Sequence, residues 1–220
     1  MILHFVLFAV WGQFIFLNPH HAIAVDNQET PKTVLFLGDS LTAGLGLDPS
    51  EAYPSLIEQK LKAAGMPFRV INAGVSGDTS ADGLRRLDWI LRGRVDVAVI
   101  ALGANDGLRG LPVDECERNL LAVVDKIREK NPAVKIVVAG MLIPPNMGAS
   151  YMREFRDMFP RVAEKRQAVL IPFLLKGVAG ISSLNLGDGI HPTAEGQKIM
   201  AETAWKVLEP ILRTTQQASQ

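Results

Sequence analysis

Apolar residues gather into five short runs along the chain after residue 30. The runs are rich in Val, Ile and Leu, and four of the five end near a glycine. Continuous apolar runs of this length are typical of strands that are buried on both faces of a parallel sheet. The expected strands span residues 33–38, 68–74, 95–103, 134–140 and 168–173.

Between these runs, apolar residues recur with the period of a helix. Leu84, Leu87 and Leu91, for example, form one apolar stripe. Ser50 is expected to cap the first helix, Pro160 to kink or break the fourth, and the polar tail after the fifth to fray. The expected helices span residues 50–65, 79–93, 114–131, 151–167 and 193–212.

Five strands that alternate with five helices predict one doubly wound α/β domain, with no internal repeat and no second domain. A chain of 220 residues is long enough to bury the core of such a domain. The domain is expected to span residues 25–220. In this class of fold, ligands bind outside the carboxyl ends of the strands.

The first 25 residues differ from the rest because they contain no Asp, Glu, Lys or Arg. Residues 5–17 form a nearly continuous apolar run, which is too short to cross a bilayer comfortably. The small-x-small sequence Ala22-Ile23-Ala24 follows. These features predict a secretory signal peptide over residues 1–24, cleaved after Ala24, and a periplasmic or secreted mature protein. An uncleaved membrane anchor is the alternative.

Charge and cysteine content narrow the class of protein. The chain has 23 Lys and Arg against 23 Asp and Glu, so its formal net charge is zero. This balance predicts no nucleic-acid partner and no stable membrane attachment after removal of the signal peptide. Cys116 is the single cysteine, which excludes an intramolecular disulfide. Neighbouring carboxylates disfavour its thiolate, so we interpret Cys116 as structural.

Four of the expected strand ends carry glycines and small polar side chains. The segments GDSLTAG, NAGVSGDTS, GANDG and LGDGIHPTAEG begin at residues 38, 72, 103 and 186. They follow the first, second, third and fifth strands. Because these ends meet at one edge of a parallel sheet, the four segments predict a shared site more readily than four unrelated turns.

His191 is the single histidine outside the predicted leader. We expect it to act as a general base, because imidazole is the usual base near neutral pH. Asp188 lies three residues earlier and could fix the tautomer of that imidazole. Ser40 is then the candidate nucleophile. A surface histidine, an Asx turn and a helix cap are the structural alternatives for these three residues.

A tetrahedral oxyanion needs hydrogen-bond donors aimed at it. The candidate donors are the backbone N–H groups of Ser40 and Gly74 and the side-chain amide of Asn105. Gly74 could instead be a turn glycine, and Asn105 could stabilise its own loop.

Other polar residues near these candidates are interpreted as structural. Asp39 and Asp106 are expected to hold loop geometry, and Arg109 to lie in solvent. Capping of the second helix is expected of Asp78, Thr79 and Ser80.

The four segments together resemble the four blocks of the SGNH (GDSL) hydrolase family, in the family's order, over residues 33–212. They are most similar to its bacterial periplasmic branch of esterases, thioesterases and lysophospholipases, also known as arylesterases. The resemblance implies a three-layer, flavodoxin-like α/β/α fold with no metal and no cofactor. It also implies Ser40 as nucleophile, His191 as base, Asp188 as its orienting carboxylate, and an oxyanion hole made by Ser40, Gly74 and Asn105.

Apolar loops after the third and fourth strands bear on the substrate. Leu108, Leu111, Ile143 and Pro144 are expected to border the site, where they would suit an acyl chain, although they could instead cover the core. We therefore predict hydrolysis of a small-molecule acyl ester or thioester through an acyl-enzyme, by a monomer or weak oligomer. A carbohydrate O-deacetylase is the alternative. No Walker motif or complete dinucleotide glycine pattern supports a nucleotide-binding domain.

Overall fold

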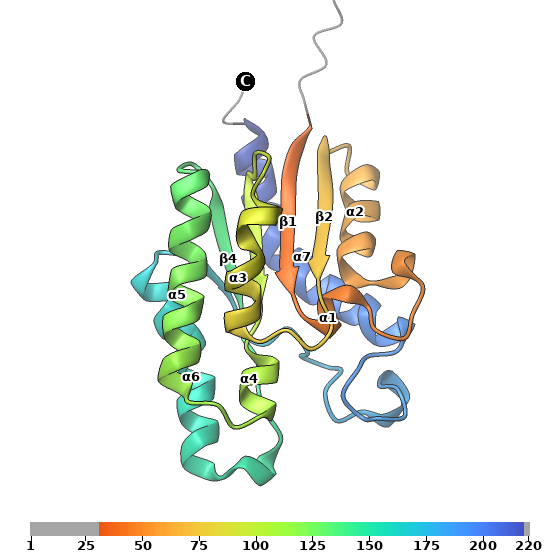
Figure 1. Ribbon diagram of the computed structural model, residues 1–220. Helices are drawn as coiled ribbons and strands as arrows, with labels where there is room; N and C mark the ends of the chain where they lie inside the picture. Colours follow the sequence, from red (N-terminus) through yellow and green to blue (C-terminus); the bar gives the residue numbers. More distant parts are fainter. Residues whose placement is uncertain (1–30, 218–220) are drawn as a thin grey trace, which may run out of the picture. The chain divides into compact units, whose positions relative to one another are not determined.

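The five expected strands form one parallel sheet in a computed structural model, which describes residues 31–217 (Figure 1). Across the sheet the strands lie in the order β2-β1-β3-β4-β5. This is the strand order of flavodoxin-like doubly wound folds, so the predicted fold class is confirmed. The strands are β1 (Lys32–Gly38), β2 (Phe68–Gly74), β3 (Val97–Ala101), β4 (Lys135–Ala139) and β5 (Val169–Ile171).

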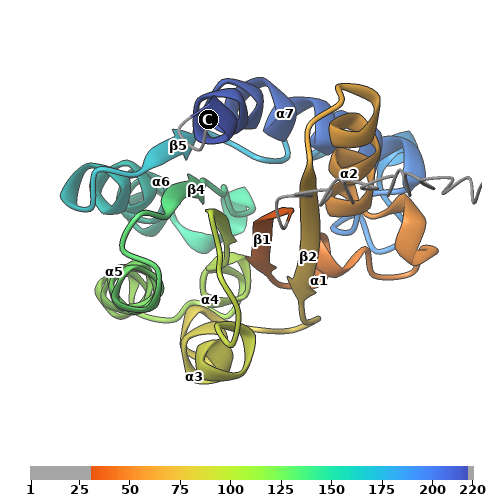
Figure 2. The same ribbon diagram turned by 90° about the horizontal axis from the view of Figure 1, so that it is seen from above.

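Helices cover both faces of the sheet. Figure 2 shows α2 and α7 on one face, with α3, α5 and α6 on the other. The short helix α1 follows β1 directly, and α4 follows β3. The helices are α1 (Ser40–Ala43), α2 (Tyr53–Ala63), α3 (Ser80–Ile90), α4 (Ala104–Leu108), α5 (Val113–Lys130), α6 (Ala149–Lys165) and α7 (Ala194–Gln217), with 3-10 turns η1 (Pro49–Glu51), η2 (Pro145–Met147) and η3 (Ser182–Leu184).

The core fills the spaces between the sheet and its two helical layers. Phe36 of β1 meets Tyr53 of α2 edge to face, with 5.4 Å between ring centroids. Phe155 and Phe159 of α6 make a similar contact at 5.3 Å. All four side chains are buried. Aromatic pairs of this geometry contribute about 0.5 to 1.5 kcal/mol beyond the area that they bury.

The edge strands differ from the expectation of burial on both faces. Central β1 and β3 are buried almost throughout, but Arg69 and Asn72 of β2 and Val169 of β5 are exposed. An edge strand has a neighbouring strand on one side only, so water reaches residues that a second neighbour would cover.

Pro160 does not break α6, which corrects one of the two outcomes expected of it, a kink or a break. The helix continues from Ala149 to Lys165 with Pro160 inside it. Pro160 is exposed, so the carbonyl that loses its N–H partner lies on the side of the helix that faces water. The chain therefore keeps one long helix against the sheet.

Two helix ends also differ from the prediction. Asp48, not Ser50, is the cap, and it starts the 3-10 turn η1; extended Ala52 then separates this turn from α2. The tail predicted to fray is helical as far as Gln217. The side-chain amine of Lys32 donates to the carbonyls of Thr215 and Gln216, which satisfies part of that helix end.

The predicted leader, residues 1–24, lies outside the described residues. Within residues 31–217, no helix combines the length and the apolarity that crossing a bilayer requires.

The position of β1 between β2 and β3 sets the place of the site. The chain leaves β1 toward β2 and then returns to the other side of β1 as β3. Gly38 is aligned with Gly74 on one neighbour and with Ala101 on the other, so three strand ends meet. A crevice at such a topological switch point is where doubly wound folds bind ligands.

Candidate active site

Ser40 is the first residue of α1 and lies at the end of β1. The cap of this helix is Asp39, whose carboxylate accepts the N–H of Leu41 at 3.0 Å, so the Ser40 hydroxyl is not needed for capping. A Cβ atom on Gly38 would lie 2.0 Å from the Thr42 hydroxyl oxygen. Glycine at this position therefore lets α1 fold back over the end of its strand.

Residues of α2 and α7 hold α1 in place. The buried Gln197 side chain of α7 donates to the carbonyl of Leu41 at 3.2 Å and accepts the N–H of Tyr53 at 2.8 Å. The Tyr53 and Thr42 hydroxyls lie 3.2 Å apart, within hydrogen-bonding distance. These contacts connect the segment that carries Ser40 to the helix that follows His191.

The loop before α7 brings Asp188 and His191 together through a tight turn. Asp188 Oδ1 accepts the backbone N–H groups of Ile190 at 2.9 Å and of His191 at 3.0 Å. Gly189 has φ +71°, a conformation that favours glycine. Buried Asn185 fixes the preceding segment by donating to the carbonyls of Val178 and Ile181.

Ser40, His191 and Asp188 form a continuous chain of hydrogen bonds. His191 Nδ1 lies 2.6 Å from Asp188 Oδ2, and His191 Nε2 lies 2.9 Å from Ser40 Oγ. The N–H and imidazole of His191, together with the N–H of Ile190, hold the pKa of the Asp188 carboxyl well below its usual range. An ionised carboxylate can only accept, so Nδ1 carries the proton and Nε2 is free to accept the Ser40 hydroxyl.

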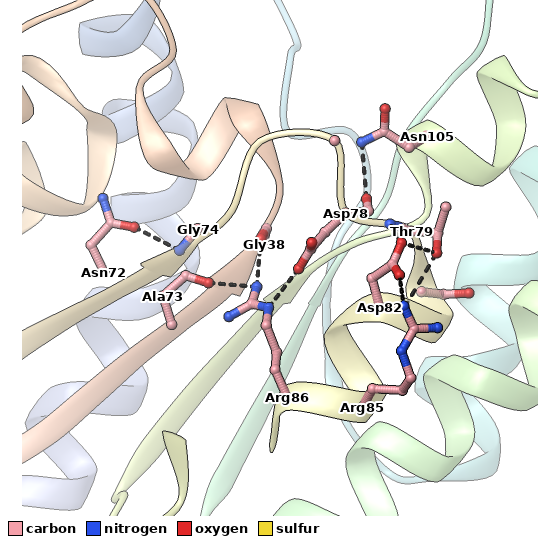
Figure 3. A network of polar contacts seen from close by, with 12 residues as sticks. Gly38, Asn72, Ala73, Gly74, Asp78, Thr79, Asp82, Arg85, Arg86 and Asn105 are labelled. Atoms are coloured by element: carbon pink, nitrogen blue, oxygen red, sulfur yellow. Dashed lines mark hydrogen bonds and ion pairs between the residues drawn. The ribbon is translucent and has the colours of Figure 1, made fainter. Parts of the chain in front are cut away.

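Gly74 does not present a free N–H group, contrary to the expected role. Its N–H donates to the Asn72 side-chain oxygen at 2.9 Å (Figure 3). The Asn72 amide in turn donates to the carbonyl of Thr42 at 2.9 Å. A Cβ on Gly74 would lie 2.3 Å from the backbone nitrogen of Ala43, so glycine is required here for the close approach of α1.

The loop after Gly74 offers other backbone donors. Val75 donates its N–H to the carbonyl of Gly38, and Asp78 donates its N–H to that of Val75. Ser76 and Gly77 keep N–H groups with no acceptor among residues 31–217. The sequence contained a signal for these donors, because the segment from residue 72 to 80 holds a second glycine, Gly77, besides Gly74.

Asn105 lies at the start of α4, after β3. Its side-chain amide donates one hydrogen bond to the backbone carbonyl of Asp78 at 2.9 Å (Figure 3). An amide group carries two hydrogens, so one N–H remains for a ligand. The next residue, Asp106, is buried and accepts the N–H and the hydroxyl of Ser80 at 2.8 and 2.5 Å.

Three polar neighbours have contacts that the sequence did not indicate. Thr79 caps α3 in a capping box with Asp82, whereas Asp78 pairs with Arg86. Arg109 is exposed, as expected, and its guanidinium also donates to the carbonyl of Gly77 at 2.9 Å. No motif in the sequence indicated Arg86, which Figure 3 shows between the ends of β1 and β2.

Asp39 is a buried carboxyl group directly before Ser40. Its Oδ2 atom has no hydrogen-bond partner among the described residues. Burial raises the pKa of Asp39 from 3.8 to about 6, while the Leu41 N–H and the charge of His191 act in the opposite direction. Asp39 therefore gains its charge near pH 6, well above an ordinary aspartate.

An apolar groove of about 550 Å³ begins beside the three hydrogen-bonded side chains of Ser40, His191 and Asp188. Leu41 and Ile190, which line it, are the sequence neighbours of Ser40 and His191. Of the four expected substrate-binding residues, Leu108, Ile143 and Pro144 line the groove and Leu111 does not. The carbonyl of Leu111 instead accepts the Tyr151 hydroxyl at 2.6 Å. Further lining residues are Ala104, Met141, Leu142, Phe173 and Leu175.

A larger cavity, of about 680 Å³, lies away from this chemistry. It is lined by Lys32 and Lys135, the first residues of β1 and β4, and thus lies at the amino ends of the strands. Neither cavity is lined by Ser40, Asp188 or His191 themselves, but only the smaller groove is lined by their sequence neighbours Leu41, Gly189 and Ile190. The smaller groove is therefore the better candidate for a substrate site.

Known proteins resemble the chain over most of its length. Residues 36–199 match the GDSL-like Lipase/Acylhydrolase family. The chain is 38% identical to Esterase TesA of Pseudomonas aeruginosa over 86% of this chain and 94% of that protein. It is 32% identical to thioesterase 1/protease 1/lysophospholipase L1 of Escherichia coli, over 90% and 91% of the two chains. The psychrotrophic esterase EstA from Pseudoalteromonas sp., solved inhibited by monoethylphosphonate, has a TM-score of 0.78 at 35% identity, covering 83% and 99% of the chains.

Replacement of Asp39 by asparagine should change how stability depends on pH. A carboxyl whose pKa is raised by folding stabilises the protein below its unfolded pKa of 3.8, and this contribution is lost as the pH rises through about 6. An asparagine side chain cannot ionise. As the pH rises from about 3.5 to 7.5, the free energy of unfolding of Asp39→Asn should therefore increase by roughly 2 to 3 kcal/mol relative to that of wild type. Urea unfolding at each pH measures the difference.

Asp48→Asn is the matched control, because Asp48 caps η1 and is exposed. Hydrogen bonds from Ser50 lower the pKa of Asp48, so this variant should instead lose stability relative to wild type as the pH rises. A stability difference for Asp39→Asn that is constant with pH would show that Asp39 does not titrate in this range.

Proposed function

Since the chain belongs to the GDSL-like lipase/acylhydrolase family and is an ester hydrolase, we propose that it cleaves acyl esters and thioesters with Ser40, His191 and Asp188. The observation that carries this proposal is the chain of hydrogen bonds of 2.9 and 2.6 Å that joins the three side chains. A hydroxyl, an imidazole and an ionised carboxylate in this order are the parts of a serine-hydrolase triad.

In the first half of the reaction, Ser40 Oγ attacks the carbonyl carbon of the substrate while His191 Nε2 takes its proton. Asp188 holds the imidazole in the required tautomer and stabilises the imidazolium. The tetrahedral intermediate then breaks its bond to the leaving alcohol or thiol, which receives the proton from His191. The product of this half is an acyl-enzyme on Ser40.

In the second half, a water molecule gives a proton to His191 Nε2 and attacks the acyl carbon. The second tetrahedral intermediate expels Ser40 Oγ, which takes that proton back, and the carboxylic acid leaves. Because hydrogen bonds keep the pKa of Asp188 low, its charge is available throughout the working pH range.

The oxyanion hole is proposed to consist of the Ser40 N–H, the second amide hydrogen of Asn105 and a backbone N–H after β2. Gly74 could supply the last donor only by leaving its hydrogen bond to Asn72. Gly77 is the better candidate, because its N–H has no acceptor among the described residues and it has no side chain to block an approaching ligand. Each such donor is worth about 10²- to 10³-fold in kcat.

The groove supports an acyl chain as the part of the substrate next to the reacting carbon. Its lining is mostly aliphatic, with Phe173 as its one aromatic residue. This surface suits methylene groups, each of which contributes about 0.8 kcal/mol when buried. We therefore favour esterase, thioesterase or lysophospholipase activity over the deacetylation of carbohydrates.

Export is also proposed, from the leader sequence. Residues 1–24 would direct translocation across the membrane and then be removed, which would leave the enzyme in the periplasm or outside the cell.

Ser40→Ala should lower kcat by at least about 10⁴-fold, because no other nucleophile is present in the hydrogen-bonded chain. The measurement is hydrolysis of p-nitrophenyl esters from acetyl to palmitoyl. A serine-directed phosphonate should add to wild type and not to the variant, as read by mass spectrometry. Ser183→Ala, a change at an exposed serine, is the control and should remain active.

Equal activity of wild type and Ser40→Ala would refute the proposed nucleophile. Wild-type protein that is inert toward every acyl chain but removes acetyl groups from sugars would point to the deacetylase instead.

Leu142→Asn should reduce kcat/KM for long acyl chains about fivefold to thirtyfold relative to acetyl esters, equivalent to about 1 to 2 kcal/mol of lost apolar contact. Leu142 lines the groove and is 46% exposed, so the change should leave the fold intact. Leu111→Asn is matched in chemistry but lies outside the groove and should leave the ratio unchanged. The same loss in both variants would mean that the acyl chain binds elsewhere.

Expression of the full chain in a Gram-negative host should give a periplasmic protein whose mass corresponds to a start at Val25. A full-length mass in the membrane fraction would support the uncleaved anchor instead.

A further inference from the structure

Arg86 connects the strand ends that surround the proposed catalytic centre. It lies on α3, and one guanidinium nitrogen, Nη2, donates to the carbonyl of Gly38 at 3.0 Å and to that of Ala73 at 2.7 Å. Its Nε donates to the Asp78 carboxylate at 2.5 Å. Figure 3 shows the guanidinium between the ends of β1 and β2, with the Asp78 carboxylate beside it. One side chain thus connects three separate segments.

Each of these segments leads to a proposed reacting group. Gly38 lies two residues before Ser40, and its carbonyl also accepts the N–H of Val75. Ala73 is the penultimate residue of β2, the strand whose following loop carries Gly77. Asp78 follows Gly77, and its backbone carbonyl accepts the amide of Asn105. Asp78, which pairs with Arg86, is thus next to Gly77 in the sequence and hydrogen-bonded to Asn105, the two residues proposed as oxyanion donors.

We propose that Arg86 is a positioning residue, which holds the segment from Val75 to Asp78 against the end of β1 so that the Gly77 N–H and the Asn105 amide point at the oxyanion. This inference rests on the proposed esterase function. It assigns no contact between Arg86 and substrate, because the role rests on the bonds that Nε and Nη2 donate to protein atoms.

The chemistry of arginine explains why this residue type suits the position. A planar guanidinium donates in fixed directions, and Arg86 uses this geometry to bind two carbonyls and one carboxylate at once. The side chains of Arg86 and Asp78 are only 21% and 11% exposed. Loss of one would leave the other largely buried and without its partner, while two strand-end carbonyls would lose a donor.

Neighbouring Arg85 provides a matched comparison. It follows Gly83 and Leu84 on the same helix, but its side chain is 73% exposed and pairs only with Asp82 in the first turn of α3. A change from arginine to lysine at position 85 is the same substitution on the same helix, at a side chain that contacts no strand end.

Arg86→Lys and Arg85→Lys are therefore the two variants to compare, with a short p-nitrophenyl ester as substrate. Arg86→Lys keeps the charge but loses the fixed geometry, and it should lower kcat about tenfold while KM stays within about twofold. A loss confined to kcat identifies an interaction made in the transition state. Arg85→Lys should match wild type in both parameters.

A double-mutant cycle with Asn105→Ala separates positioning from a general structural role. If Arg86 acts by orienting the oxyanion donors, adding Arg86→Lys to the Asn105→Ala variant should lower kcat further by less than about threefold. The full tenfold loss in that background would overturn the inference, and so would wild-type kcat in the single variant. Should Arg86→Lys fail to fold, Asp78→Asn replaces it, because it weakens the same contact and keeps the backbone carbonyl; the same cycle then decides.

Ser40→Ala, measured beside these variants, distinguishes the two levels of the argument. An active Ser40→Ala protein would refute the proposed function and, with it, the role of Arg86. An inactive Ser40→Ala protein together with unchanged kcat in Arg86→Lys would refute only the role of Arg86.

Discussion

The hydrogen bond between Ser40 Oγ and His191 Nε2 is the interaction on which the site depends, because it joins residues 151 positions apart in the chain. Each partner is fixed by different elements. Asp39 starts α1 and Gln197 of α7 holds it, while the turn from Asp188 sets the imidazole. The contact therefore forms only after β1 has entered the sheet and α7 has packed on it.

The carboxyl edge of the sheet raises a second physical requirement, since strands that end leave backbone groups without ladder partners. At this edge the carbonyls of Gly38 and Ala73 are satisfied by Arg86, and the N–H of Gly74 by Asn72. The same bonds shape the loop that carries Gly77. The end of a parallel sheet thus needs donors for structural reasons, and their placement also directs the loop groups toward a ligand.

Much of this was visible in the sequence. Apolar runs predicted all five strands, and the polar segments after them predicted which edge carries the site. Ser40, Asp188 and His191 lie together as the spacing indicated. Two details were wrong: Pro160 does not break α6, and Leu111 does not line the groove, although its backbone carbonyl accepts the Tyr151 hydroxyl.

The sequence by itself determined the order of strands and helices along the chain and the kinds of candidate reacting group, because these follow from local periodicity and residue chemistry. It could not decide which N–H groups stay free. The Asn72 side chain accepts the N–H of Gly74, whereas the N–H of Gly77 has no acceptor among residues 31–217. Nor could it identify Arg86, which is one of several arginines until α3 packs beside the ends of β1 and β2. Only tertiary structure decides such questions, because a donor's role depends on the acceptors that folding brings within about 3 Å of it.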